Sequence, residues 1–68
     1  MRYAIVIEKA ESNYSAFVPD LPGCIATGRT LKEVTKRMTK AIEMNLDAMR
    51  EDGDDIPEPS RVELVEVA

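Results

Sequence analysis

The chain has 68 residues, a mass of 7.6 kDa and a net charge of −4 at pH 7. A chain this short forms a single domain, residues 1–68, with too little core to enclose a cleft built from several elements, so we expect a partner or a second copy to cover further apolar surface. The acidic balance argues against a protein that mainly holds nucleic-acid backbones, and zero histidines with one cysteine exclude zinc sites and histidine-assisted nucleophiles.

The charge is unevenly distributed along the chain. Residues 1–40 carry seven basic and four acidic side chains, whereas residues 41–68 carry two basic and nine acidic ones, a net charge of −7. This acidic half favours a basic partner. The lone Cys24 cannot form an internal disulfide, and neither a secretory segment nor a membrane-length apolar run is recognisable, so we expect a cytoplasmic protein that does not associate with membranes.

The first part of the chain predicts three strands. Residues 2–10 place apolar side chains on both faces of an extended chain, which predicts a central strand, and residues 14–18 alternate again after three turn-forming residues. These two segments therefore predict an antiparallel hairpin. The prolines and glycine of residues 19–23 predict a rigid, shaped loop, and residues 24–27 predict a short third strand.

A long amphipathic helix is predicted next. Thr30 followed by Glu33 matches a capping box, in which a hydroxyl and a carboxylate satisfy free N–H groups at a helix start. From Leu31 to Met49, apolar side chains recur at steps of three and four residues, and Gly53 is a candidate C-cap. The apolar stripe predicts that the helix lies on the sheet.

The C-terminal part predicts one more strand. The prolines of residues 56–60 predict an extended connector, and residues 61–67 predict a fourth strand that a right-handed crossover places parallel to the first. The predicted fold is an α+β two-layer sandwich of β-β-β-α-β order, with a four-stranded, mostly antiparallel sheet in the order 3-2-1-4 and one long helix on one face. Apolar side chains point to both faces of the last strand, so it is either shielded on both sides or paired with another chain. We therefore expect a homo-oligomer, either a dimer or a tetramer.

Several features occur together in a fixed order. They are a strand ending in Glu8 and Lys9, the loop PDLPGC from Pro19 to Cys24, a glycine before the capped helix, and the closing segment IPEPS. In this order they resemble the N-terminal domain of HicB-type antitoxins over nearly the whole chain. The resemblance implies a partial, degraded RNase H-like fold and the neutralisation of a small basic HicA-like mRNA interferase by direct binding. Many family members add a C-terminal DNA-binding domain; with none following here, we expect no direct DNA binding unless another polypeptide supplies it.

Two regions are candidate contacts for such a toxin. In the loop, Asp20 offers a carboxylate and Leu21 an apolar anchor, although a tight corner alone explains the prolines and the glycine. Beyond the helix, the acidic side chains either attract a basic partner or are simply solvated, and their spacing does not match a calcium-binding loop. The candidate partner-binding residues are therefore Asp20, Leu21, Asp52, Asp54, Asp55 and Glu58.

Three further interpretations concern chemistry. Cys24 in a short apolar strand is typical of a small buried hydrophobe rather than a reactive thiol. Four basic residues between positions 32 and 40 suggest contact with RNA phosphates, but no aromatic residues accompany them for base stacking. A residual nuclease needs several carboxylates around paired Mg²⁺ ions, and the strands supply Glu8 at best. We therefore predict a non-enzymatic antitoxin with no catalytic residue, cofactor or metal; the alternatives are an orphan protein-interaction module and a residual RNase H-like nuclease.

Overall fold

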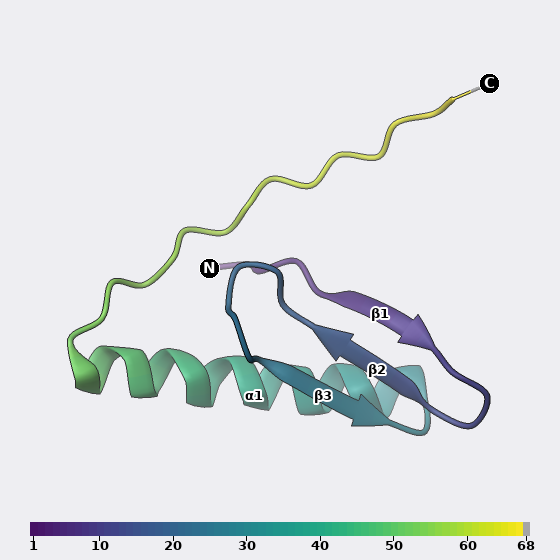
Figure 1. Cartoon of the computed structure of the whole chain (residues 1–68), viewed down its shortest axis with the longest axis horizontal. Coiled ribbons are helices and arrows are strands. Elements are labelled where there is room, and N and C mark those ends of the chain that lie inside the picture. Colours follow the sequence, from purple (N-terminus) through teal and green to yellow (C-terminus); the bar gives the residue numbers. More distant parts are fainter. Residues whose placement is uncertain (68) are drawn as a thin grey trace.

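The computed structural model, which describes residues 1–67, has a three-stranded sheet with one long helix on one face (Figure 1). The strands β1 (Val6–Lys9), β2 (Tyr14–Phe17) and β3 (Ile25–Gly28) pair antiparallel in the order β1-β2-β3, and the helix α1 (Leu31–Asp52) follows them. The α+β class, the two layers and the meander of the first three strands are confirmed.

The first two strands form the predicted hairpin. The Ala10 N–H donates to the Asn13 carbonyl at 2.8 Å and so closes the turn between them. β1 is shorter than the predicted strand because β2 ends at Phe17. Beyond Phe17, the Val18 N–H donates to the Cys24 carbonyl at 3.2 Å, on the side of β3. Pro19 has no N–H to donate to the residues that precede β1.

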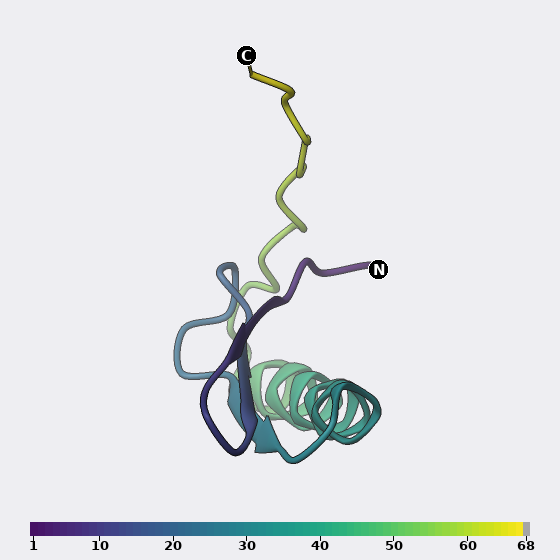
Figure 2. The ribbon, with the colours of Figure 1, turned by 90° about the vertical axis from the view of Figure 1, so that its right-hand side faces the viewer.

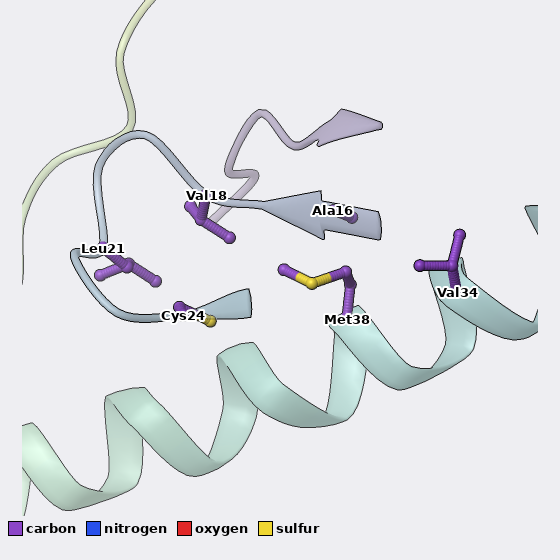
Figure 3. Close-up of a cluster of buried hydrophobic side chains, with 6 residues drawn as sticks. All are labelled: Ala16, Val18, Leu21, Cys24, Val34 and Met38. Carbon is purple, nitrogen blue, oxygen red and sulfur yellow. The ribbon is translucent and has the colours of Figure 1, made fainter. Parts of the chain in front are cut away.

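The loop between β2 and β3 is the tight corner that its prolines and glycine predict. Its turns are closed by backbone hydrogen bonds of 3.1 Å from the Leu21 N–H to the Val18 carbonyl and from the Cys24 N–H to the Leu21 carbonyl. Gly23 has a left-handed φ of 80°, which a residue without Cβ adopts at little cost. The corner turns both Leu21 and Cys24 into the protein interior, as Figure 3 shows.

Both predicted ends of the helix are confirmed. The Thr30 hydroxyl accepts a hydrogen bond from the Glu33 N–H at 3.0 Å. The Glu33 carboxylate reaches back to the Arg29 N–H at 3.3 Å, one residue earlier than in a strict capping box. At the other end Gly53 has a φ of 74° and donates its N–H to the Arg50 carbonyl at 3.2 Å, so that the last turn is closed by a left-handed C-cap.

The core lies between the helix and the central strand β2 (Figure 3). Val34 and Met38 project from the helix into this layer and are completely buried. The helix passes so close to the end of β3 that a Cβ at Gly28 would lie 2.7 Å from the Val34 backbone nitrogen. The fully assembled core consists of Ala16, Val18, Leu21, Cys24, Val34 and Met38.

The fourth strand predicted over residues 61–67 is not formed within the described residues. After the helix the chain continues as an extended segment that leaves the sheet (Figures 1 and 2). The predicted order 3-2-1-4 is therefore correct only for its first three strands, and β1 is an edge strand rather than a central one. Hydrogen bonds to Tyr3 and Asp20, far away in the sequence, tie the connector of residues 56–60 to the body, and the residues after it extend outward.

Candidate partner-binding site

Asp20 holds the C-terminal connector against the loop. Its carboxylate accepts a hydrogen bond from the Ser60 N–H at 2.8 Å and a second one from the Ser60 hydroxyl. Because both bonds favour the ionised form, they lower the pKa of Asp20 below its ordinary value. The carboxylate predicted to contact a partner is therefore already used within the chain, where it positions the connector.

A second tie fixes the start of the same connector. The Tyr3 hydroxyl donates to the carbonyl oxygen of Pro57. Together with the bonds between Asp20 and Ser60, it fastens the connector at two points on one end of the sheet (Figure 1). Sequence patterns did not reveal Tyr3 or Ser60 as partners, since the two pairs are separated by 54 and 40 residues along the chain.

Leu21 does not lie on the surface. Its side chain is only 1% exposed and belongs to the core, beside Val18 and Cys24 (Figure 3). Leu21 was predicted as an apolar anchor for a toxin, and in the single chain its side chain packs into the core instead. The sequence around an apolar loop residue looks the same whether its side chain contacts a partner or packs into the core of its own chain. Here the backbone turns of residues 18–24 direct the Leu21 side chain into the core.

The other predicted acidic residues are exposed. Asp52 is the last residue of α1, two more aspartates follow the C-cap, and Glu58 lies in the connector. None of them takes part in the ion pairs found among residues 1–67. These pairs are Arg37–Glu33, Arg50–Asp47 and Arg61–Glu63. We call this surface the acidic end; it consists of Asp52, Asp54, Asp55 and Glu58.

The face of the sheet opposite the helix is uncovered (Figure 2). Strand register places Val6, Phe17 and Ile25 side by side across it. They are 38%, 38% and 69% exposed, a row of apolar side chains of the kind that other proteins contact. No pattern in the sequence indicates this row, because its three members come from three strands and only the strand register brings them together.

Arg37, one of the basic helix residues, makes contacts within the chain, and Glu8 lies exposed on β1. Arg37 donates to the Thr27 carbonyl at 2.9 Å and pairs with Glu33 at 3.2 Å. Glu8 is exposed on β1, and within residues 1–67 no three Cys, His, Asp or Glu side chains lie close enough to hold a metal ion.

Cys24 is buried as predicted, which raises the pKa of its thiol. No helix in the described part of the chain is long and apolar enough to span a membrane.

Comparison with known proteins places the chain in a family. A UPF0150 protein of Archaeoglobus fulgidus is 43% identical over 70 residues, covering 98% of this chain and 96% of its own length. A UPF0150 protein of Thermoplasma acidophilum is 32% identical over 94% of both chains. An uncharacterised 14.9 kDa protein from the rep-hol intergenic region of Haemophilus phage HP1 is 38% identical, and the chain spans 47% of its length. The family model of the HicB-like antitoxin of bacterial toxin–antitoxin systems matches residues 3–68, and the chain therefore belongs to the HicB-like antitoxins.

Proposed function

We propose that the protein binds and neutralises a small basic HicA-like mRNA interferase by covering its RNA-binding or active surface. Membership of the antitoxin family suggests an antitoxin role and, with it, a toxin partner. The observation that carries the proposal is the acidic end, whose carboxylates are exposed and outside the ion pairs of the described residues. A toxin that binds mRNA needs cationic side chains for the phosphates, and an acidic surface attracts the same side chains.

The candidate residues have different roles in this proposal. Asp52, Asp54, Asp55 and Glu58 attract the toxin directly. Asp20 acts by holding the connector that carries Glu58, and Leu21 acts from the core by shaping the loop. The exposed row of Val6, Phe17 and Ile25 supplies apolar contact area that charges alone do not.

The remaining features of the proposal follow the family resemblance. The protein acts in the cytoplasm, by binding rather than by catalysis, and as a homo-oligomer, either a dimer or a tetramer. The proposal also includes a partial, degraded RNase H-like fold, of which the three antiparallel strands and the helix would form the first part. Residues 1–68 bind no DNA directly in this proposal, since their charge is net negative.

The test is the association rate with a HicA-like toxin encoded beside this gene, measured together with inhibition of RNA cleavage. Reversing three charges of the acidic end, with Asp52→Lys, Asp54→Lys and Asp55→Lys, should slow association about tenfold or more and weaken its salt dependence. A control with the same change in net charge places lysines at exposed positions away from the acidic end and from the β1 edge, with Glu11→Lys, Ser12→Lys, Thr35→Lys and Asp47→Lys. Equal rates for the two variants would overturn the role of the acidic end.

The two alternatives predict different results in the same assay. An orphan interaction module would neither bind the toxin nor inhibit its cleavage of RNA. A residual nuclease would cleave RNA or RNA–DNA hybrids with Mg²⁺ in the absence of toxin, and Glu8→Gln would abolish that turnover. We expect neither result.

A further inference from the structure

Residues 61–67, which we call the arm, carry apolar side chains that are largely exposed in the single chain. Val62, Leu64, Val65 and Val67 are 65%, 97%, 79% and 83% exposed. The arm is extended, and its apolar side chains alternate to both faces, as in a strand that is covered on two sides. Both views show it running away from the sheet (Figures 1 and 2).

Within residues 1–67, no strand pairs with the outer edge of β1, which could therefore take up such a strand. The inward hydrogen bond of the Ala10 N–H to Asn13 sets the alternation of the ladder, which turns the backbone groups of Ile7 and Lys9 away from β2. Apolar side chains lie on both faces of this edge, with Ile7 half-buried on the helix side and Val6 exposed on the other. An unpaired edge of this kind is a template for another strand.

The helix leaves space beneath the β1 edge. α1 lies under β2 and β3, and none of its Cα atoms comes within 8 Å of one in β1. A groove of about 320 Å³ opens between the helix and the residues that precede β1. Tyr3, Ile42 and Leu46 give its wall an apolar character, and the inward side chains of a strand beside β1 would fill it.

The opposite edge of the sheet is less suitable. At β3 the Arg37 guanidinium already donates to the outward carbonyl of Thr27, at 2.9 Å. The helix also packs closely beneath that strand, since Gly28 has no room for a Cβ. Of the two edges, β1 therefore offers both free backbone groups and apolar surface to be covered.

We propose that the arm of one copy pairs as a fourth strand beside β1 of a second copy, and that two copies exchange arms reciprocally. This inference specifies the interface of the homo-oligomer in the proposed function. The chain's own β1 is the poorer acceptor, because Asp20 and Tyr3 tie the connector so that the arm leaves the body. In a closed pair two arms meet two β1 edges, so the β1 edge of each copy is covered.

A second copy also matches the arm better than a basic toxin does. The arm is mainly apolar with a net charge of −1, and residues 1–10, which contain β1, carry a net charge of +1. The small charges favour this pairing, whereas a strongly basic surface is attracted more by the acidic end. One face of the arm fills the groove beside Leu46, and the other extends the exposed apolar row that begins at Val6.

Disulfide trapping between chains tests the pairing directly and without toxin. Leu64→Cys and Val65→Cys place a thiol on each face of the arm, and each variant is mixed with a chain carrying Val6→Cys on β1. Neighbouring strands bring Cβ atoms within disulfide range, so one of the two mixtures should yield a mixed disulfide in high proportion. Ile25→Cys on the same face of β3 is the matched control and should not be trapped, and the native Cys24 is buried.

Mass measurement by light scattering provides the second readout. The wild-type protein at micromolar concentration should have twice the chain mass of 7.6 kDa. Val62→Asp combined with Leu64→Asp should raise the dimer dissociation constant at least tenfold, while Met44→Asp on the exposed helix surface should not. Val62 and Leu64 are largely exposed in the single chain, so these changes should leave the fold of the body intact, which circular dichroism checks.

Several results would overturn the inference. They are a wild-type monomer, a dimer whose stability the arm variants leave unchanged, and trapping at Ile25→Cys in place of Val6→Cys. Protection of the arm's backbone amides from hydrogen exchange only after toxin is added would also overturn the inference, because the arm would then pair with the toxin and not with a second copy. Toxin inhibition by a protein that shows no arm exchange would refute this inference while leaving the antitoxin proposal standing.

Discussion

The body of the protein, residues 1–53, and its C-terminal segment, residues 54–67, contain similar apolar alternation but differ in burial. Ala16 in β2 and Val18 directly after the strand are buried under the helix, whereas Leu64 and Val65 in the arm are among the most exposed apolar residues described. The alternation shows in both cases that a segment is able to form a strand. Whether the strand is covered depends on a second layer, which the helix supplies for β2 and which the single chain does not supply for the arm.

The sharpest test of this comparison substitutes the same residue type in both regions. Leu21→Ala removes a core side chain that is 1% exposed, and it should reduce the free energy of unfolding by about 2–5 kcal/mol, because a cavity is left behind. Leu64→Ala removes a side chain that is 97% exposed, and it should change the free energy of unfolding of the monomer by less than about 0.5 kcal/mol. Urea unfolding followed by circular dichroism, at protein concentrations low enough to favour the monomer, measures both.

A comparable loss in the two leucine variants would contradict the comparison. It would mean that the arm is covered within one chain, as the predicted strand order 3-2-1-4 requires. A stable Leu21→Ala variant with weakened toxin binding would instead restore the original prediction that Leu21 is a contact residue.

The sequence was informative wherever neighbours along the chain decide the structure. The hairpin turn, the corner at residues 19–23 and both helix caps depend on side chains and backbone groups a few residues apart, and all were predicted. The position of the arm depends on Asp20 and Ser60, which are 40 residues apart, and no local pattern relates them. Leu21 was placed on the wrong side of the loop for the same reason, because an apolar loop residue does not show which surface it meets.

Gly28 at the end of β3 and Gly23 in the loop before β3 distinguish a crowded position from a strained one. At Gly28 a Cβ would meet the Val34 backbone at 2.7 Å, and Gly28→Ala should reduce the free energy of unfolding by about 3 kcal/mol, because the start of the helix must shift. Gly23 has open space around it but a φ of 80°, so Gly23→Ala should cost about 1 kcal/mol for the left-handed backbone. Thermal or urea unfolding of both variants checks the order.

Asparagine separates the two causes further. Gly23→Asn should recover part of the loss, since asparagine tolerates the left-handed region better than alanine. Gly28→Asn should be at least as unstable as Gly28→Ala, because crowding grows with the side chain. A recovery at position 28 would show that the approach of the helix to β3 is looser than the structure indicates.

The smallest expected effect concerns the boundary between the two regions, where Asp20 holds Ser60. The folded pKa of Asp20 is lowered, so its bonds to Ser60 favour the folded, tied state most strongly when the carboxyl is ionised. This contribution is fully present above the ordinary aspartate pKa of about 3.9 and is lost as the pH falls through the lower folded value. Acid should therefore release the connector before it unfolds the body.

The amide resonance of Ser60 in NMR spectra reports this release. It should shift with pH at the depressed pKa of Asp20, because its N–H donates to that carboxylate at 2.8 Å. In Asp20→Asn the acceptor has no charge to lose, so the same resonance should no longer respond to pH in this range. Asp54→Asn is the matched control, since Asp54 lies outside the connector and should leave the Ser60 titration as it is in the wild type. A Ser60 amide that ignores pH in the wild-type protein would show that Asp20 does not tie the connector, and the arm would then leave the body without a fixed direction.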